Sequence, residues 1–245
     1  MADRYWVGGT AAWDGTAGTK WSTTSGGAGG ASVPTSADDV FFDNLSTGTC
    51  TISSGNTGAK SINCTGFTGT LAGNAVITVS GSVTLAAGMT FTYNGTMTLN
   101  GTGTLTSAGK TFGPVNISGS GITVTLGSDI TLSSSITLSN GTFTTANFNL
   151  VATQFISVAA NTRVLNLGSS TLTLSGTSAF NLVGSITALT INAGTSTINA
   201  TGSNAQITTG GQLTPAFTLY NVNYTNTGSN NAHIISGGFT IQNLS

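Results

Sequence analysis

Acidic side chains are the residues of this chain with the most chemistry to offer, and they are few. The 245 residues contain six Asp and no Glu. Asp38 and Asp39 are the only adjacent acids, and Asp43 follows shortly after them. This spacing suits either a calcium site or a turn whose carboxylates accept backbone N–H bonds. The turn is the simpler interpretation, so we predict no metal site here.

Cleavage of a polysaccharide requires two carboxylates at acid–base spacing, or several that hold calcium. Beyond residue 43 the chain offers only Asp129, together with one arginine, Arg163, and one histidine, His233. A single carboxylate cannot make an acid–base pair. We therefore predict no catalytic residue, no cofactor and no enzymatic activity.

The cysteines leave two interpretations open. Cys50 and Cys64 are the only two in the chain, and with one histidine they do not make a metal site. They could form a disulfide if the fold brings them together, or lie as a stacked pair of buried thiols.

Charge is almost absent, at 4% of residues, and the net charge is −1. Nucleic-acid binding requires clustered Lys and Arg, whereas the five basic residues here are scattered, so we predict no nucleic-acid partner. No apolar run approaches the roughly 18 to 20 residues of a spanning helix, which argues against membrane insertion. Hydrophobic residues make up 38% of the chain, too many for a disordered one.

Short strands with period two, separated by Gly and Asn turns, recur along the chain; examples are "AVITV" (75–79) and "ITVTL" (122–126). In stacked coils, identical positions lie about 4.8 Å apart, where like charges repel but neutral hydroxyl and amide side chains form ladders. We therefore predict an all-β fold, a parallel β-helix (β-solenoid) of irregular coils of about 20 residues, which would give nine or ten coils.

The composition changes near residue 44. Residues 1–44 contain all three tryptophans and seven of the eleven charged residues, whereas residues 45–245 have the solenoid pattern. An open solenoid end needs a cap, and tryptophan also anchors interfaces. We predict an N-terminal cap or docking module in residues 1–44. Its candidate residues are Trp6, Trp13, Trp21, Asp38, Asp39, Phe41 and Phe42.

The same segment carries a family resemblance. Its run of Trp6, Gly8, Gly9, Trp13, Lys20, Trp21 and Ser22, followed by Val33, Pro34, Asp38 to Phe42, resembles the N-terminal module of large β-helix proteins. Similar openings occur in bacterial surface adhesins and in predicted virion proteins of marine bacteriophages. The resemblance is confined to this segment and implies an architecture more than an activity.

Thr-x-Thr pairs begin at positions 90, 96, 102, 123, 142, 171 and 195, and arrays of such pairs mark some ice-binding solenoids. Some successive pairs are close in the sequence and others are far apart. We expect this spacing to be too uneven for one file. Ice binding is therefore the third candidate function.

The first candidate is a non-enzymatic structural or adhesive virion protein, such as a phage fibre, appendage or capsid-decorating protein. It would act as a rigid spacer and display surface. Its partners would be other virion proteins or further copies of itself, with a trimer favoured. Host-surface glycans would be a further partner. The second candidate is a bacterial cell-surface adhesin or filament subunit. No secretion signal precedes the module, which favours the virion. The C-terminal "GGFTIQNLS" lacks a cap, which predicts a covering partner or a longer protein.

Overall fold

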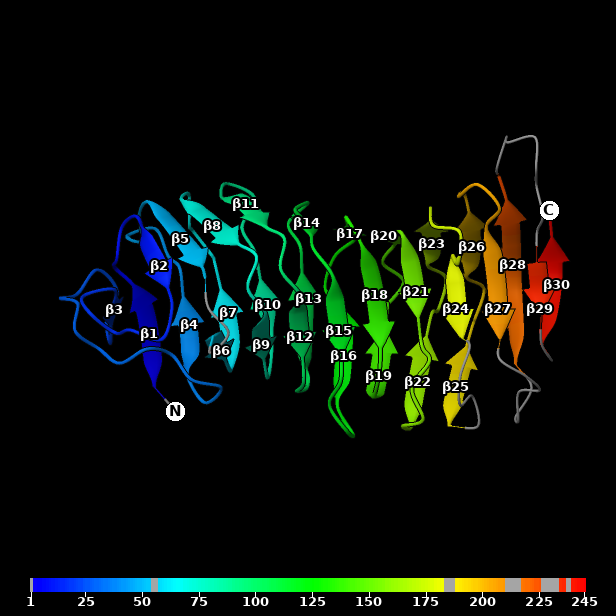
Figure 1. Ribbon diagram of the computed structural model, residues 1–245, viewed down its shortest axis with the longest axis horizontal. Helices are drawn as coiled ribbons and strands as arrows, with labels where there is room; N and C mark the ends of the chain where they lie inside the picture. The colour runs from blue at the N-terminus through cyan, green and yellow to red at the C-terminus, as the bar shows by residue number, and fades with distance from the viewer. Residues whose placement is uncertain (1, 54–56, 183–187, 210–216, 226–233, 237–238) are drawn as a thin grey trace.

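The computed structural model describes residues 2–53, 57–182, 188–209, 217–225, 234–236 and 239–245. It is all-β, and its strands coil into a parallel β-solenoid of about 8 turns, which confirms the predicted fold class. Figure 1 shows the coils stacked side by side along the long axis, from blue at the N-terminus to red at the C-terminus. In these residues no helix has the length and apolarity needed to cross a membrane.

The strands of the described residues form four sheets, here called A to D. Sheet A has the order β3 (Trp21–Ser22), β1 (Asp3–Trp6), β4 (Asp39–Phe41), β7 (Ser61–Asn63), β10 (Val83–Thr84), β13 (Gly103–Thr106), β16 (Thr123–Leu126), β19 (Gly141–Thr144), β22 (Arg163–Asn166) and β25 (Leu189–Asn192). Sheet C has the order β6 (Thr57–Ala59), β9 (Ile77–Val79), β12 (Met97–Leu99), β15 (Val115–Ile117), β18 (Ser135–Leu138), β21 (Gln154–Ile156), β24 (Phe180–Leu182), β27 (Gln206–Thr209) and β29 (Ile234–Ser236).

Sheets B and D share one face of the solenoid. Sheet B has the order β2 (Ala11–Trp13), β5 (Thr49–Ile52), β8 (Thr70–Gly73) and β11 (Thr90–Tyr93). Sheet D has the order β14 (Thr111–Phe112), β17 (Ile130–Leu132), β20 (Leu150–Ala152), β23 (Thr171–Leu174), β26 (Thr197–Ala200), β28 (Thr218–Tyr224) and β30 (Thr240–Leu244). The rings of Phe91 in β11 and Phe112 in β14, whose centroids are 5.2 Å apart, join the two sheets.

The core is a stack of apolar side chains inside the coils. Along sheet A, the register aligns Val40, Ile62, Val83, Leu105 and Leu126, each at most 1% exposed. Alternate residues of the same strands are mostly Thr, Ser or Asn and point outward, as period two predicts. Each fully buried aliphatic side chain contributes roughly 1.5–3 kcal/mol.

The coils vary in length, and several are longer than the sequence predicts. The coil that joins Thr98 to its partner Asn116 is short, whereas the coil that joins Thr208 to Ser236 is much longer. The first coil is longer still, because Arg4 pairs with Val40. These long coils explain why the chain makes about 8 turns instead of nine or ten.

Amide ladders run along the outside of the C-terminal coils. The Nδ2 group of Asn192 donates to Oδ1 of Asn166 (2.7 Å) in sheet A, and Asn243 donates in the same way to Asn221 (2.8 Å) in sheet D. Neutral side chains therefore bond between coils at the spacing where like charges would repel. This is the arrangement that the scarcity of charge predicts.

The N-terminal end of sheet A is closed by an antiparallel strand. β3 pairs with β1 in the register Tyr5 with Ser22 and Trp6 with Trp21, whereas the other paired strands of the described residues run parallel. It occupies the edge that the parallel ladder would leave open. The predicted boundary near residue 44 falls between β4 and β5, although both strands belong to sheets shared with later coils.

Candidate functional site

Asp38 organises the turn before β4. It is 7% exposed; its Oδ1 accepts the N–H of Ala2 (3.0 Å), and its Oδ2 accepts the N–H (3.0 Å) and the hydroxyl (2.8 Å) of Thr35. Desolvation alone would raise the pKa of this carboxyl, but the hydrogen bonds from Thr35 and Ala2 outweigh it, so the pKa lies below its usual value. The predicted turn, with a carboxylate accepting backbone N–H bonds, is confirmed at Asp38.

Replacing Asp38 with Asn should weaken the fold and flatten its response to acid. Because the folded-state pKa lies below the unfolded value of about 3.9, the carboxylate stabilises the fold above that pH. This contribution is lost as the pH falls through the folded-state pKa. We expect the variant to be about 1–2 kcal/mol less stable at pH 7 and to lose less stability than wild type on acidification. Urea unfolding between pH 7 and pH 3 measures both, and parallel curves would contradict the assignment.

The neighbouring acids are also held by structural contacts. Asp39 accepts the hydroxyl of Ser61 and lies 3.1 Å from Lys60 Nζ. Oδ1 of Asp43 accepts the N–H groups of Leu45 (2.9 Å) and Ser46 (3.0 Å). Within the described ranges, no three His, Cys, Asp or Glu side chains lie close enough together to hold a metal ion. These carboxylates therefore serve turns and an ion pair.

Most of the predicted cap or docking residues lie inside the solenoid. Trp6, Trp13, Trp21 and Phe42 are all 0% exposed. The ring centroid of Trp21 is 5.1 Å from that of Trp6 and 5.0 Å from that of Trp13, both edge to face. Packing of the first coil accounts for these four side chains. Docking stays a prediction, and within this set it would fall on the partly exposed Asp39 and Phe41.

Phe41 forms an aromatic pair that the sequence did not reveal. It lies on the outward side of β4, and its ring stacks on that of Tyr5 in β1, with centroids 4.8 Å apart and planes 16° apart. The register β1–β4 produces this stack, since Tyr5 pairs with Phe41. The same register places Asp3 beside Asp39.

The remaining reactive residues are dispersed. Asp129 is exposed, and its Oδ1 accepts the N–H of Asn149 (2.8 Å), whereas Arg163 is 0% exposed inside the coil. His233 lies outside the described residues. Cys50 and Cys64 are both buried free thiols, and burial raises the pKa of Cys64 to about 12. Of the two interpretations for the cysteines, the structure therefore has the unpaired thiols.

The seven Thr-x-Thr pairs are divided among the four sheets and do not share one file, as their uneven intervals predict, but three of them stack in sheet A. These three pairs are Thr102/Thr104, Thr123/Thr125 and Thr142/Thr144. Thr125 pairs with Thr104 and Thr144, Thr123 pairs with Thr142, and the N–H of Thr123 donates to Thr102 Oγ1 (3.1 Å). Successive Thr-x-Thr pairs that are about one coil length apart in the sequence lie on consecutive coils of the same sheet. Those that are only a few residues apart lie on different sheets of the solenoid.

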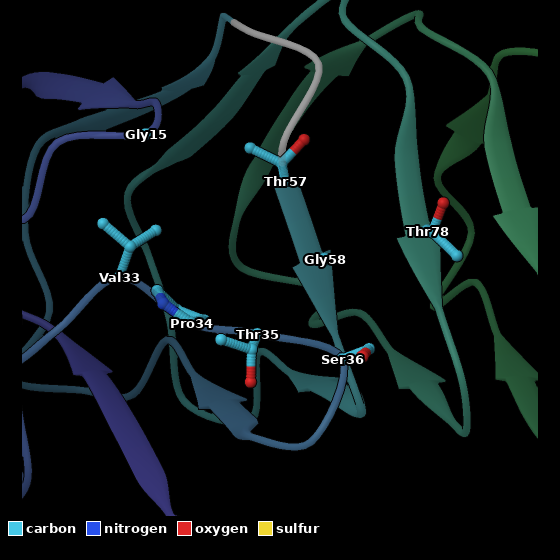
Figure 2. Close-up of a pocket in the computed structure, with 8 residues that line it drawn as sticks. All are labelled: Gly15, Val33, Pro34, Thr35, Ser36, Thr57, Gly58 and Thr78. Carbon is cyan, nitrogen blue, oxygen red and sulfur yellow. The ribbon is translucent and has the colours of Figure 1, made fainter.

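A hollow of about 460 Å³ opens near the N-terminal end, outside sheet C. Figure 2 shows the eight residues that line it, here called the Gly58 hollow: Gly15, Val33, Pro34, Thr35, Ser36, Thr57, Gly58 and Thr78. The segment before β4 forms one wall, and β6 and β9 form the other. Four of the lining residues carry a hydroxyl group, and none of the eight is charged. Sequence reasoning missed this site, because it depends on how residues 33–36 pack against a strand that is distant in the sequence.

Comparison with models of known protein families, with curated proteins and with solved structures finds no match to this chain.

Proposed function

We propose that this chain is a non-enzymatic structural and adhesive virion protein, a phage fibre, appendage or capsid-decorating protein that serves as a rigid spacer and display surface. The resemblance of residues 6–42 to the N-terminal module of such proteins supports the virion assignment. The alternative with the same mechanism is a bacterial cell-surface adhesin or filament subunit.

The observation that carries the proposal is the neutrality of the outward files. Along sheets A and D, they consist largely of Thr, Ser and Asn, which bond from coil to coil. Asp38, Asp39 and Asp43 are held in turns or an ion pair. Such a surface supports contact by hydrogen bonds, and weak contacts gain strength when several copies act together. Trimeric association, which we include in the proposal, would supply those copies.

Gold-labelled antibodies against the purified chain test the location. We expect label on appendages or capsids of particles in a lysate, imaged by electron microscopy. Label on the envelope of intact cells, with none on particles, would overturn the virion assignment in favour of the adhesin. Light scattering of the purified chain tests the trimer, and a monomer at all concentrations would remove that part of the proposal.

Ice binding is the third candidate, favoured by the three Thr-x-Thr pairs stacked in sheet A. Hydroxyls in the file repeat about every 4.8 Å on a rigid backbone, an array that can order water. The test is thermal hysteresis of wild type, of Thr125→Lys in the file, and of Thr131→Lys on sheet D as control. We expect hysteresis in wild type and the control and its loss in Thr125→Lys. No hysteresis in wild type would remove this candidate.

A further inference from the structure

We propose that the Gly58 hollow binds a neutral sugar residue of a glycan. The proposal rests on the adhesive function above and names its ligand class and its site. The hollow's volume of about 460 Å³ lies within the roughly 300–1,000 Å³ of small-molecule sites. It is broadly open to solvent, so that one unit of a longer chain can contact it while the rest remains outside.

Gly58 creates the space. It occupies the outward position of β6 that Thr78 fills in β9 and Thr98 fills in β12. A Cβ at Gly58 would meet nothing closer than the backbone N of Ser36, at 3.5 Å, which is ordinary contact. Its φ is not in the left-handed region, where glycine would be required. The fold therefore tolerates a Cβ here, and a larger side chain would extend into the hollow that Gly58 lines.

Gly73 in β8 provides a contrast on the same solenoid. It has φ +118°, and a Cβ there would clash with the carbonyl oxygen of Ile52 on the preceding coil. Packing alone explains Gly73. Gly58 has no such explanation, and what it leaves is a gap at the start of a file whose next two members are threonines.

The lining offers hydrogen bonds of both kinds. The Thr57 hydroxyl donates to Val76 O (2.9 Å), whereas the Thr35 hydroxyl donates to Asp38 and accepts the N–H of Ala37 (3.3 Å), so both already bond within the protein. Within the described part of the chain, the hydroxyls of Ser36 and Thr78 make no hydrogen bond to protein and can donate as well as accept. This mixture matches the alternating donors and acceptors of a sugar ring.

Charge and apolar surface narrow the ligand class. None of the eight lining residues is charged, so an anionic sugar would be desolvated with no cation to pair with. Val33 and Pro34 supply an apolar wall against which the C–H face of a sugar can pack. Four hydroxyls make the hollow a poor site for an apolar ligand. A neutral polyhydroxylated ring suits both the apolar wall and the hydroxyl groups of the hollow.

Binding to arrayed oligosaccharides tests the site. The probes are neutral oligosaccharides ending in glucose, galactose or mannose, with sialylated and sulfated ones for comparison, and titration of the best probe gives its Kd. We expect wild type to bind at least one neutral probe. Gly58→Thr should weaken binding about 10-fold or more by filling the space, and Thr78→Val, which keeps the shape but loses the hydroxyl, about 3- to 10-fold.

Ile156→Thr is the matched control. It adds a threonine at the corresponding outward position of β21, on the same sheet and far along the rod, and should leave the Kd within about twofold. Circular dichroism checks that each variant folds, and Thr78→Val keeps the test decisive if Gly58→Thr does not.

Two results overturn the proposal. One is a Kd for the neutral probe that is unchanged from wild type in both Gly58→Thr and Thr78→Val. The other is that wild type binds only charged probes, or binds no probe. In either case, antibody label on virions would still support the proposed function, so the two failures are distinguishable.

Discussion

Trp21→Ala should lower the free energy of unfolding of the first coil by about 3–5 kcal/mol, the usual cost of removing a large buried aromatic side chain. Trp21 is fully buried and touches Trp6 and Trp13 edge to face. It also belongs to β3, which covers the edge of β1. The substitution therefore leaves a cavity and loosens the strand that closes the sheet.

Hydrogen exchange shows which strands lose stability in the Trp21→Ala variant. Coils of a solenoid contact mainly their neighbours, so we expect amides of β1 to β4 to exchange faster while those of β13 to β22 stay protected. Trp21→Phe is the control: in the described residues the indole N–H of Trp21 has no hydrogen-bond partner, so we expect its loss to cost less than about 1.5 kcal/mol. Unchanged exchange of β1 to β4 in Trp21→Ala would show that the tryptophan cluster does not hold this end.

Arg163→Ala should destabilise the middle coils by about 3–5 kcal/mol, an effect as large as that of Trp21→Ala, because it leaves hydrogen-bond acceptors unpaired and a cavity inside the coil. Arg163 is 0% exposed at an inward position of β22. Its Nη1 donates to the carbonyl (2.8 Å) and hydroxyl (2.9 Å) of Ser157, and its Nε donates to the carbonyl of Asn161 (2.8 Å). Arg163 thus stabilises the turn between β21 and β22 through hydrogen bonds made inside the coil. Burial lowers the pKa of the guanidinium, which reflects the cost of placing a cation there.

Arg163→Met separates hydrogen bonding from volume. Methionine fills much of the space but leaves the carbonyl groups of Ser157, which is buried, and of Asn161 without this donor, so we expect a loss of about 2–3 kcal/mol. Urea unfolding of the three proteins gives the values. A methionine variant as stable as wild type would mean that the buried guanidinium makes no net contribution.

The fold class could be predicted because it depends on the local alternation of apolar and polar residues. Met97, Leu99, Leu105 and Phe112 alternate with Thr and Ser, and all four are at most 2% exposed, as the pattern predicts. The scarcity of charge has its physical counterpart in the amide ladders, such as that of Asn192 and Asn166. Both inferences depend only on neighbours in the sequence or on identical positions of adjacent coils.

The arrangement of the surface could not be predicted, because it depends on which coil pairs with which residue. The stacked Thr-x-Thr pairs of β13, β16 and β19 follow from a register that turns of varying length set. The stack of Tyr5 on Phe41 crosses the long first coil. Arg163 has an ordinary surface residue type, and only the corner carbonyls that it meets explain its burial.

The central claim is that this rod binds through neutral side chains without acting chemically on what it binds. Incubation of the purified protein with isolated bacterial envelopes and neutral polysaccharides tests it, by measuring the protein retained on the material together with reducing ends and unsaturated sugar products over time. The account predicts retained protein and no products. Products that accumulate in proportion to the protein added would contradict it.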